Sequence, residues 1–171
     1  PIITPADFFI DDDSCGVQTL LDSIATMGEQ EKLREVAQRN LQNVKSLGTE
    51  TPHTREILSA LWMRSMSPGR NRGGTKSDLH LDITRSSIVD DNAFTAELDK
   101  VISNSVNIHG EETADKRLHF ELAENPRSKV RSTARNDKLW HISADHQRIG
   151  QTCYPGEDIK HIRRTIKDMF M

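Results

Sequence analysis

The stretch that decides the fold runs from Asp90 to Lys138 and has the sequence DDNAFTAELDKVISNSVNIHGEETADKRLHFELAENPRSKVRSTARNDK. Asp90 is of a residue type that caps helix N-termini. After it, apolar side chains recur at helical spacing, namely at Phe94, Leu98, Val101 and Ile102. This spacing gives a helix one apolar face, so we predict an amphipathic helix that packs on a core.

A β-hairpin is predicted after this helix. Residues 106–108 and 118–122 flank a polar turn at 109–116. In the second flanking segment apolar and polar residues alternate, which directs successive side chains to opposite faces of a strand. Pro126 then ends the strand, and residues 127–135 form a basic segment that predicts a short helix or turn.

The chain before Asp90 predicts further helices. Residues 1–13 are acidic and are expected to be extended, and apolar spacing predicts helices at about 14–27, 31–46, 51–66 and 75–83. Thr51 followed by Pro52 predicts the start of the third of these helices. Thr75 with Asp78 resembles a capping box. The order helix, short helix, helix and hairpin over residues 51–126 predicts a winged helix-turn-helix.

The predicted fold is therefore mainly α with a small β-hairpin (α+β), with a winged helix-turn-helix core and flanking helices. We divide the chain into an N-terminal helical segment (1–50), a winged-helix-like domain (51–126) and a C-terminal basic segment with a helix (127–171). In the last part, apolar spacing from Ile159 to Phe170 predicts a final helix, and three residues are expected to be buried: Leu139, Trp140 and Ile142.

Composition narrows the function classes. Aromatic residues make up 5% of the chain, which disfavours an aromatic platform for stacking nucleic-acid bases. The net charge is -3, so any nucleic-acid contact must come from a local basic patch. No apolar run of about 18 residues and no signal peptide occur, so we expect no membrane span. Cys15 and Cys153 lie far apart and are expected to be free thiols of a cytoplasmic protein.

Charge patterning separates the predicted helix that would enter DNA from the basic segments. In a winged helix the second helix of the pair normally enters the major groove. Here that helix carries Lys100 against four acids: Asp90, Asp91, Glu97 and Asp99. Such a helix repels phosphates. Basic residues cluster on either side of it, and our candidates for nucleic-acid or anion contact are Arg70, Arg72, Lys76, Arg127, Lys129, Arg131 and Arg135. Solvated arginines that pair with the acidic helix surface are the alternative interpretation.

Enzymatic constellations fit the sequence poorly. The loop from Pro68 to Lys76 is rich in Gly and Arg, but it follows a helix and lacks the spacing of a phosphate-binding P-loop. A zinc site would need ligands from among His141, His146, Cys153 and His161. Of these, only His141 and His146 come close to the spacing usual for a pair of zinc ligands. No G-x-S-x-G motif occurs. We therefore predict no catalytic, cofactor-binding or metal-binding residue.

Several non-catalytic motifs resemble a known family. They are LWMRSMS near Leu61, LHLDI near Leu79, DDNAF near Asp90, NSVNIH near Asn104, and ENPRSKV followed by ARNDKL. These motifs resemble a segment of large bacterial AAA+ ATPases encoded in phage-resistance islands of the PglY and BREX type. The resemblance implies an internal region downstream of the nucleotide-binding core, which binds ATP and Mg in the whole protein. No position here matches the Walker A lysine or the Walker B carboxylates, so no ATP-site residue is carried over.

The sequence thus leaves three hypotheses. The first is a non-enzymatic accessory module, a fragment of a larger ATPase, whose partners are the rest of that ATPase or another subunit. Pro1 in place of Met, and a final helical pattern with no stop signal, favour such a fragment. The second is a nucleic-acid-binding module, with DNA contacted by the basic segments 64–76 and 127–138. The third is a small enzyme or metal protein.

Overall fold

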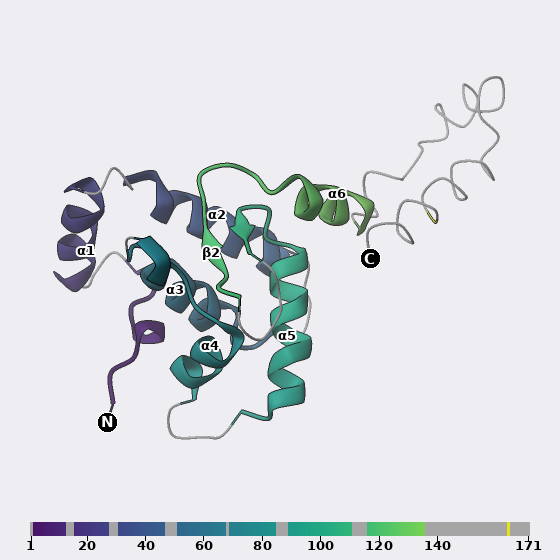
Figure 1. Cartoon of the computed structure of the whole chain (residues 1–171), viewed down its shortest axis with the longest axis horizontal. Coiled ribbons are helices and arrows are strands. Elements are labelled where there is room, and N and C mark those ends of the chain that lie inside the picture. Colours follow the sequence, from purple (N-terminus) through teal and green to yellow (C-terminus); the bar gives the residue numbers. More distant parts are fainter. Residues whose placement is uncertain are drawn as a thin grey trace.

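The computed structural model of the chain describes residues 2–12, 16–27, 31–46, 51–67, 69–84, 89–110, 116–135 and 164 (Figure 1). Its elements, in chain order, are η1 (Pro5–Asp7), α1 (Gly16–Met27), α2 (Glu31–Ser46), α3 (Thr54–Ser65), η2 (Gly69–Asn71), α4 (Lys76–Ile83), α5 (Asp91–Ser103), β1 (Ile108–His109), β2 (His119–Phe120) and α6 (Pro126–Arg135). The predicted mainly helical fold with a small antiparallel hairpin is confirmed.

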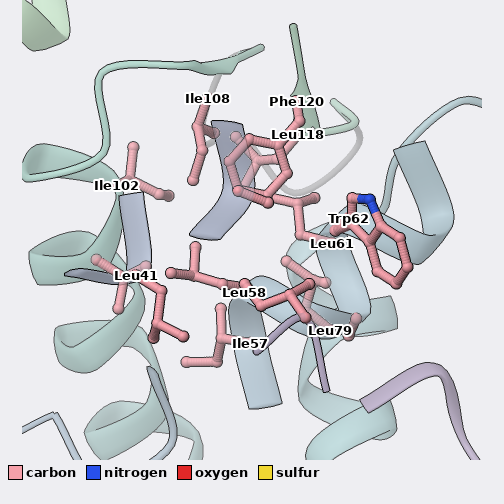
Figure 2. Close-up of a cluster of buried hydrophobic side chains, with 14 of the residues drawn as sticks. Leu41, Ile57, Leu58, Leu61, Trp62, Leu79, Ile102, Ile108, Leu118 and Phe120 are labelled. Atoms are coloured by element: carbon pink, nitrogen blue, oxygen red, sulfur yellow. The ribbon is translucent and has the colours of Figure 1, made fainter. Parts of the chain in front are cut away.

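Helix α3 lies at the centre of the molecule. It contacts η1, α2, α4, α5 and β2. Its middle apolar residues are fully buried, namely Ala60 and the four that Figure 2 labels: Ile57, Leu58, Leu61 and Trp62. A helix that is apolar around most of its circumference is stable only when other elements surround it. Helix α3 therefore positions these five elements, whereas α1 contacts α2 and α6 contacts α5.

The hairpin is joined to the segment before α4. Strand β1 pairs antiparallel with β2, with Ile108 opposite Phe120 and His109 opposite His119. On the other edge of β2, Gly74 forms an antiparallel bridge with Leu118, through two backbone hydrogen bonds of 2.9 and 2.8 Å. The order across this small sheet is therefore Gly74, β2, β1. This arrangement ties the chain between α3 and α4 to the hairpin that follows α5.

Two predicted helix starts are confirmed. Thr75 and Asp78 form a reciprocal capping box at α4, with a Thr75 N to Asp78 Oδ2 distance of 2.9 Å and an Asp78 N to Thr75 Oγ1 distance of 3.1 Å. The Asp90 carboxylate accepts hydrogen bonds from the backbone N–H groups of Asn92 and Ala93 at the start of α5. Both caps satisfy N–H groups that a helix leaves unpaired, which is why short-range sequence patterns identify them.

The predicted start of α3 is wrong. Thr51 and Pro52 lie in a turn, and His53 occupies the N-cap position without a capping side-chain bond of its own. Instead, Glu97 of α5 accepts a hydrogen bond from the His53 backbone N–H at 2.6 Å and faces His53 Nδ1 at 2.9 Å. A carboxylate near a helix N-terminus interacts favourably with the helix dipole. The helix start is thus set by a residue 44 positions away in the chain.

The expectation of an extended N-terminal segment is also wrong in part. Residues 5–7 form the 3-10 turn η1, which packs on α3, and Ala6 and Ile10 are fully buried. Thr4 begins this turn, and its hydroxyl donates to the Asp82 backbone carbonyl at 2.7 Å. The segment folds because its apolar side chains fill space beside α3, a gain that local composition does not reveal.

At the other edge of the hairpin, the alternation predicts that Leu122 faces the core, but this residue is 51% exposed because β2 ends at Phe120. The basic segment after the hairpin is helical, as α6. Three predictions fall on residues that the structure does not describe: most of the hairpin turn, the burial of Leu139, Trp140 and Ile142, and, apart from Arg164, the final helix from Ile159 to Phe170.

Candidate functional site

The solvent face of α5 is small and acidic. Its exposed residues are Asp91, Asn92, Ala93, Ala96, Asp99 and Lys100. Together with the exposed cap Asp90, this face carries three carboxylates and one ammonium group, that of Lys100. Lys76 and His80 of α4 lie beside Asp91, whose carboxylate oxygens are 3.7 Å from Lys76 Nζ and 3.6 Å from His80 Nδ1. An acidic face of this kind repels the phosphates of a DNA groove.

Glu97 does not belong to this face, although the sequence analysis counted it among the acids of the helix that would enter DNA. It is 7% exposed and lies against His53. The position of Glu97 in the sequence already indicates that its side chain is buried. Glu97 comes three residues after Phe94 and four before Val101, which is the separation of residues that share one helix face. A buried carboxylate needs hydrogen-bond partners, and the N-terminus of α3 supplies them.

The basic loop at 64–76 is engaged within the fold. Arg72 donates to the carbonyl of Phe120 at 2.6 Å and to the carbonyl of Ser65 at 3.3 Å, and its Nη1 lies 3.8 Å from Glu121. Lys76 faces Asp91 as described above. Arg70, by contrast, is exposed, and no ion pair is recorded for it among the described residues. Of the three predicted contact residues in this loop, Arg70 is therefore the one whose charge faces solvent.

Two further arginines act as internal clamps. Arg64 of α3 makes a bidentate pair with Asp82 of α4, with Nε to Oδ2 at 2.5 Å and Nη2 to Oδ1 at 2.8 Å. The hydrogen bond from Arg64 to Asp82 raises the pKa of Arg64 above its usual value, despite the desolvation that opposes this shift. Arg117 donates to the Gly73 carbonyl at 2.7 Å and lies 3.4 Å from Asp78. These contacts hold α3, α4 and the hairpin together.

Helix α6 presents the second basic segment. Arg127 is exposed, with no side-chain partner recorded among the described residues, whereas Lys129 pairs with Glu124. Arg131 is half-buried, and Arg135 ends the helix. Arg127 and Arg131 line a groove of about 260 Å³ together with Ile102, Ile108, Gly110, Asn125 and Ser128. The structure thus brings two of the four predicted α6 residues to one concave surface.

Histidines gather on the outer face of the hairpin. The rings of His109 and His119 are cross-strand neighbours with centroids 6.2 Å apart, and Glu121 lies 3.0 Å from His119 Nε2 and 3.8 Å from His109 Nδ1. The hydrogen bond from His119 lowers the pKa of Glu121 below its usual value. Even so, among the described residues no three His, Cys, Asp or Glu side chains are arranged to hold a metal ion. His141, His146, Cys153 and His161 lie outside those residues.

Within the described part of the chain, we find no helix with the length and apolar character that crossing a bilayer requires. No family model, no curated protein and no solved structure matches the chain.

Proposed function

We propose that this chain is a non-catalytic winged helix-turn-helix accessory module of a larger AAA+ ATPase of phage defence, and that it couples the ATPase to a partner domain or subunit. The helix order α3, α4 and α5, followed by β1 and β2, supports the winged-helix assignment. The bridge of Gly74 to Leu118 adds the short first strand that such a fold carries between its first two helices. The sequence motifs that resemble the ATPases support the assignment to a larger AAA+ ATPase of phage defence.

The observation that carries the proposal is the composition of the exposed α5 face. Three carboxylates surround two exposed alanines, Ala93 and Ala96, on the surface that would enter a DNA groove. Small and acidic surfaces suit contact with a basic protein surface, because opposite potentials attract and small side chains permit close approach. We therefore assign this face to a protein partner.

Site-specific photocrosslinking tests the protein contact. A benzoylphenylalanine residue is introduced at Ala96 in cells that carry the native gene neighbourhood, and crosslinked products are identified by mass spectrometry. We expect an ATPase of that neighbourhood to be captured at Ala96. The matched control is Gln42, an exposed residue of α2, which should give no such product. Equal capture at both positions, or none at Ala96, would contradict the proposal.

The competing function is nucleic-acid binding by the basic segments, and the solvent-facing charges of Arg70 and Arg127 favour it. It predicts saturable, steeply salt-dependent binding of duplex DNA, with a dissociation constant of about 1–100 μM at physiological salt. Fluorescence anisotropy with a mixed-sequence duplex at low salt measures it. Arg127→Glu, Arg131→Glu and Arg135→Glu should abolish any such binding. We expect the unmodified chain to give no saturable signal, and DNA saturation that these three changes remove would replace our proposal.

A further inference from the structure

We propose that an internal water molecule joins α2 to the segment between α5 and β1, where it donates a hydrogen bond to the side chain of Asn40 and bonds to the hydroxyl of Ser105. Asn40 lies on α2, and Ser105 lies between the end of α5 and the start of β1. Both residues are fully buried. The inference is independent of the proposed coupling role, because neither residue belongs to the exposed face of α5.

The neighbours of Asn40 allow its side-chain amide one orientation. Its Nδ2 group donates to the Val36 carbonyl at 2.8 Å and to Asn107 Oδ1 at 3.0 Å, so both of its N–H bonds have partners. Exchange of the amide nitrogen and oxygen would place an oxygen against those two oxygens, where no hydrogen bond can form. Asn40 Oδ1 is therefore the other end of the amide, and among the described residues it has no hydrogen-bond partner.

Asn107 fixes this arrangement from the opposite side of the junction. Its Nδ2 group donates to the carbonyls of Leu122 and Ala123, each at 3.2 Å, which leaves its Oδ1 as the acceptor that faces Asn40. The two amides thus connect α2, the segment before β1 and the chain after β2. Because a slip of α2 along the hairpin would separate these donors from their acceptors, the junction sets the register between them.

The Ser105 hydroxyl is a second buried group at this junction that lacks a partner. Ser105 is two residues before Asn107, and no hydrogen bond to its Oγ forms within the part of the chain that the structure describes. A buried polar atom without a partner costs free energy, and internal waters commonly supply the missing bonds. An amide oxygen only accepts hydrogen bonds, whereas a hydroxyl donates and accepts. One water that donates to Asn40 Oδ1 and bonds to Ser105 Oγ satisfies both atoms.

A high-resolution crystal structure of the full chain tests the water directly. We expect an ordered water about 2.5–3.0 Å from both Asn40 Oδ1 and Ser105 Oγ. In solution, the side-chain amide protons of Asn40 should show a nuclear Overhauser contact with long-lived water. Well-ordered density at this junction that contains no such water would overturn the inference.

The sign of a stability change provides a second test. If the Ser105 hydroxyl had no partner, Ser105→Ala would remove a costly buried group and raise the melting temperature. If the water bonds to this hydroxyl, the same change removes a hydrogen bond, and we expect the melting temperature to fall by about 2–4 °C. A melting temperature that rises or stays the same would contradict the proposed water.

Ser65→Ala is the matched control for this measurement. Ser65 is as deeply buried as Ser105, and the partners of its hydroxyl belong to the protein: it donates to the Leu61 carbonyl at 2.6 Å and accepts from the Phe120 N–H at 2.9 Å. Its loss should therefore lower the melting temperature at least as much as Ser105→Ala does. The comparison calibrates the shift that a lost hydroxyl bond produces in this core.

Discussion

At the scale of single residues, Gly73 occupies a position that leaves no space for a side chain. Its φ of +81° lies in the left-handed region, and a Cβ there would collide with the Leu118 carbonyl oxygen and lie 2.8 Å from the His119 Cβ. The N–H of Gly73 donates to the Arg64 carbonyl at 2.9 Å. The close approach of the chain before α4 to β2 therefore requires a residue without a side chain.

Gly73→Ala should lower the free energy of unfolding by roughly 3–4 kcal/mol, since it adds a collision to left-handed strain. Gly69 provides the matched control, because its φ is +69° but a Cβ there would have nothing within 4 Å. Gly69→Ala should cost only about 1–2 kcal/mol from strain alone. Urea denaturation followed by circular dichroism measures both changes. Equal losses would show that β2 does not approach Gly73 as closely as described.

The Arg64–Asp82 pair also acts at the residue scale. Asp82 is 5% exposed in its side chain, and Arg64 is 24% exposed. A double-mutant cycle with Arg64→Ala and Asp82→Ala should give a coupling energy of about 2 kcal/mol. The comparison pair is Lys129–Glu124, whose side chains are 59% and 47% exposed. Its coupling should be at most about 0.5 kcal/mol, because solvent screens the two charges. A similar coupling in both pairs would contradict the role of Arg64 as an internal clamp.

At the scale of elements, the capping box of α4 gives the helix a pH-dependent start. The hydrogen bond from the Thr75 backbone lowers the pKa of Asp78 below its usual value, and Arg64 and Arg117 add to this effect. A lowered pKa in the folded state means that the charged form is favoured by folding. The stabilisation is therefore complete above the unfolded pKa of about 3.9 and is lost as the pH falls through the folded pKa.

Asp78→Asn should consequently cost about 1 kcal/mol at pH 6, which is typical of a lost cap. The difference between the variant and the unmodified chain should shrink as the pH falls below about 4. Urea denaturation of both proteins from about pH 6 down to about pH 2.5 measures it. A difference that stays constant across this range would mean that the Asp78 charge plays no part in holding α4.

Contacts between elements also explain why the sequence of the basic loop does not reveal which of its charges face solvent. The charges at Arg72 and Lys76 are directed by β2 and by α5, which come later in the chain. A pattern of arginines between two helices is the same whether the side chains face solvent or bind carbonyl groups across the fold. Arg70 of the same loop lies in η2 and is exposed.

At the scale of the whole molecule, one buried cluster extends across the predicted boundary at residue 50. It includes Leu33, Leu41 and Val44 of α2 together with Ile57 and Leu58 of α3. A buried polar contact adds to this junction, since Asn40 Nδ2 donates to Asn107 Oδ1 at 3.0 Å and so joins α2 to the segment before β1. The division at residues 50 and 126 remains a prediction, whereas the packing joins the first two parts.

Removal of residues 1–50 should therefore prevent cooperative folding of the rest. Each large apolar side chain withdrawn from the core forfeits about 2 kcal/mol, and the four large buried apolar residues of α2 (Leu33, Val36, Leu41 and Val44) together approach the whole stability of a typical domain. Urea denaturation of the shortened chain should show no cooperative transition, in contrast to the full chain. A sharp transition and dispersed amide resonances in the shortened chain would establish residues 51–126 as an independent domain.

The sequence by itself determined the features that depend on neighbours within a few residues. The bounds of α2, the capping box of α4, the Asp90 cap and the helical spacing of α5 follow from hydrogen bonds and side-chain positions inside one helix turn. Only the tertiary structure decided the burial of Glu97 and the start of α3. It also decided the use of Arg64 and Arg72 as clamps and the joint placement of Arg127, Ser128 and Arg131 in one groove. These features rest on contacts between residues far apart in the chain, and no local pattern specifies which distant partner a charged or polar side chain will meet.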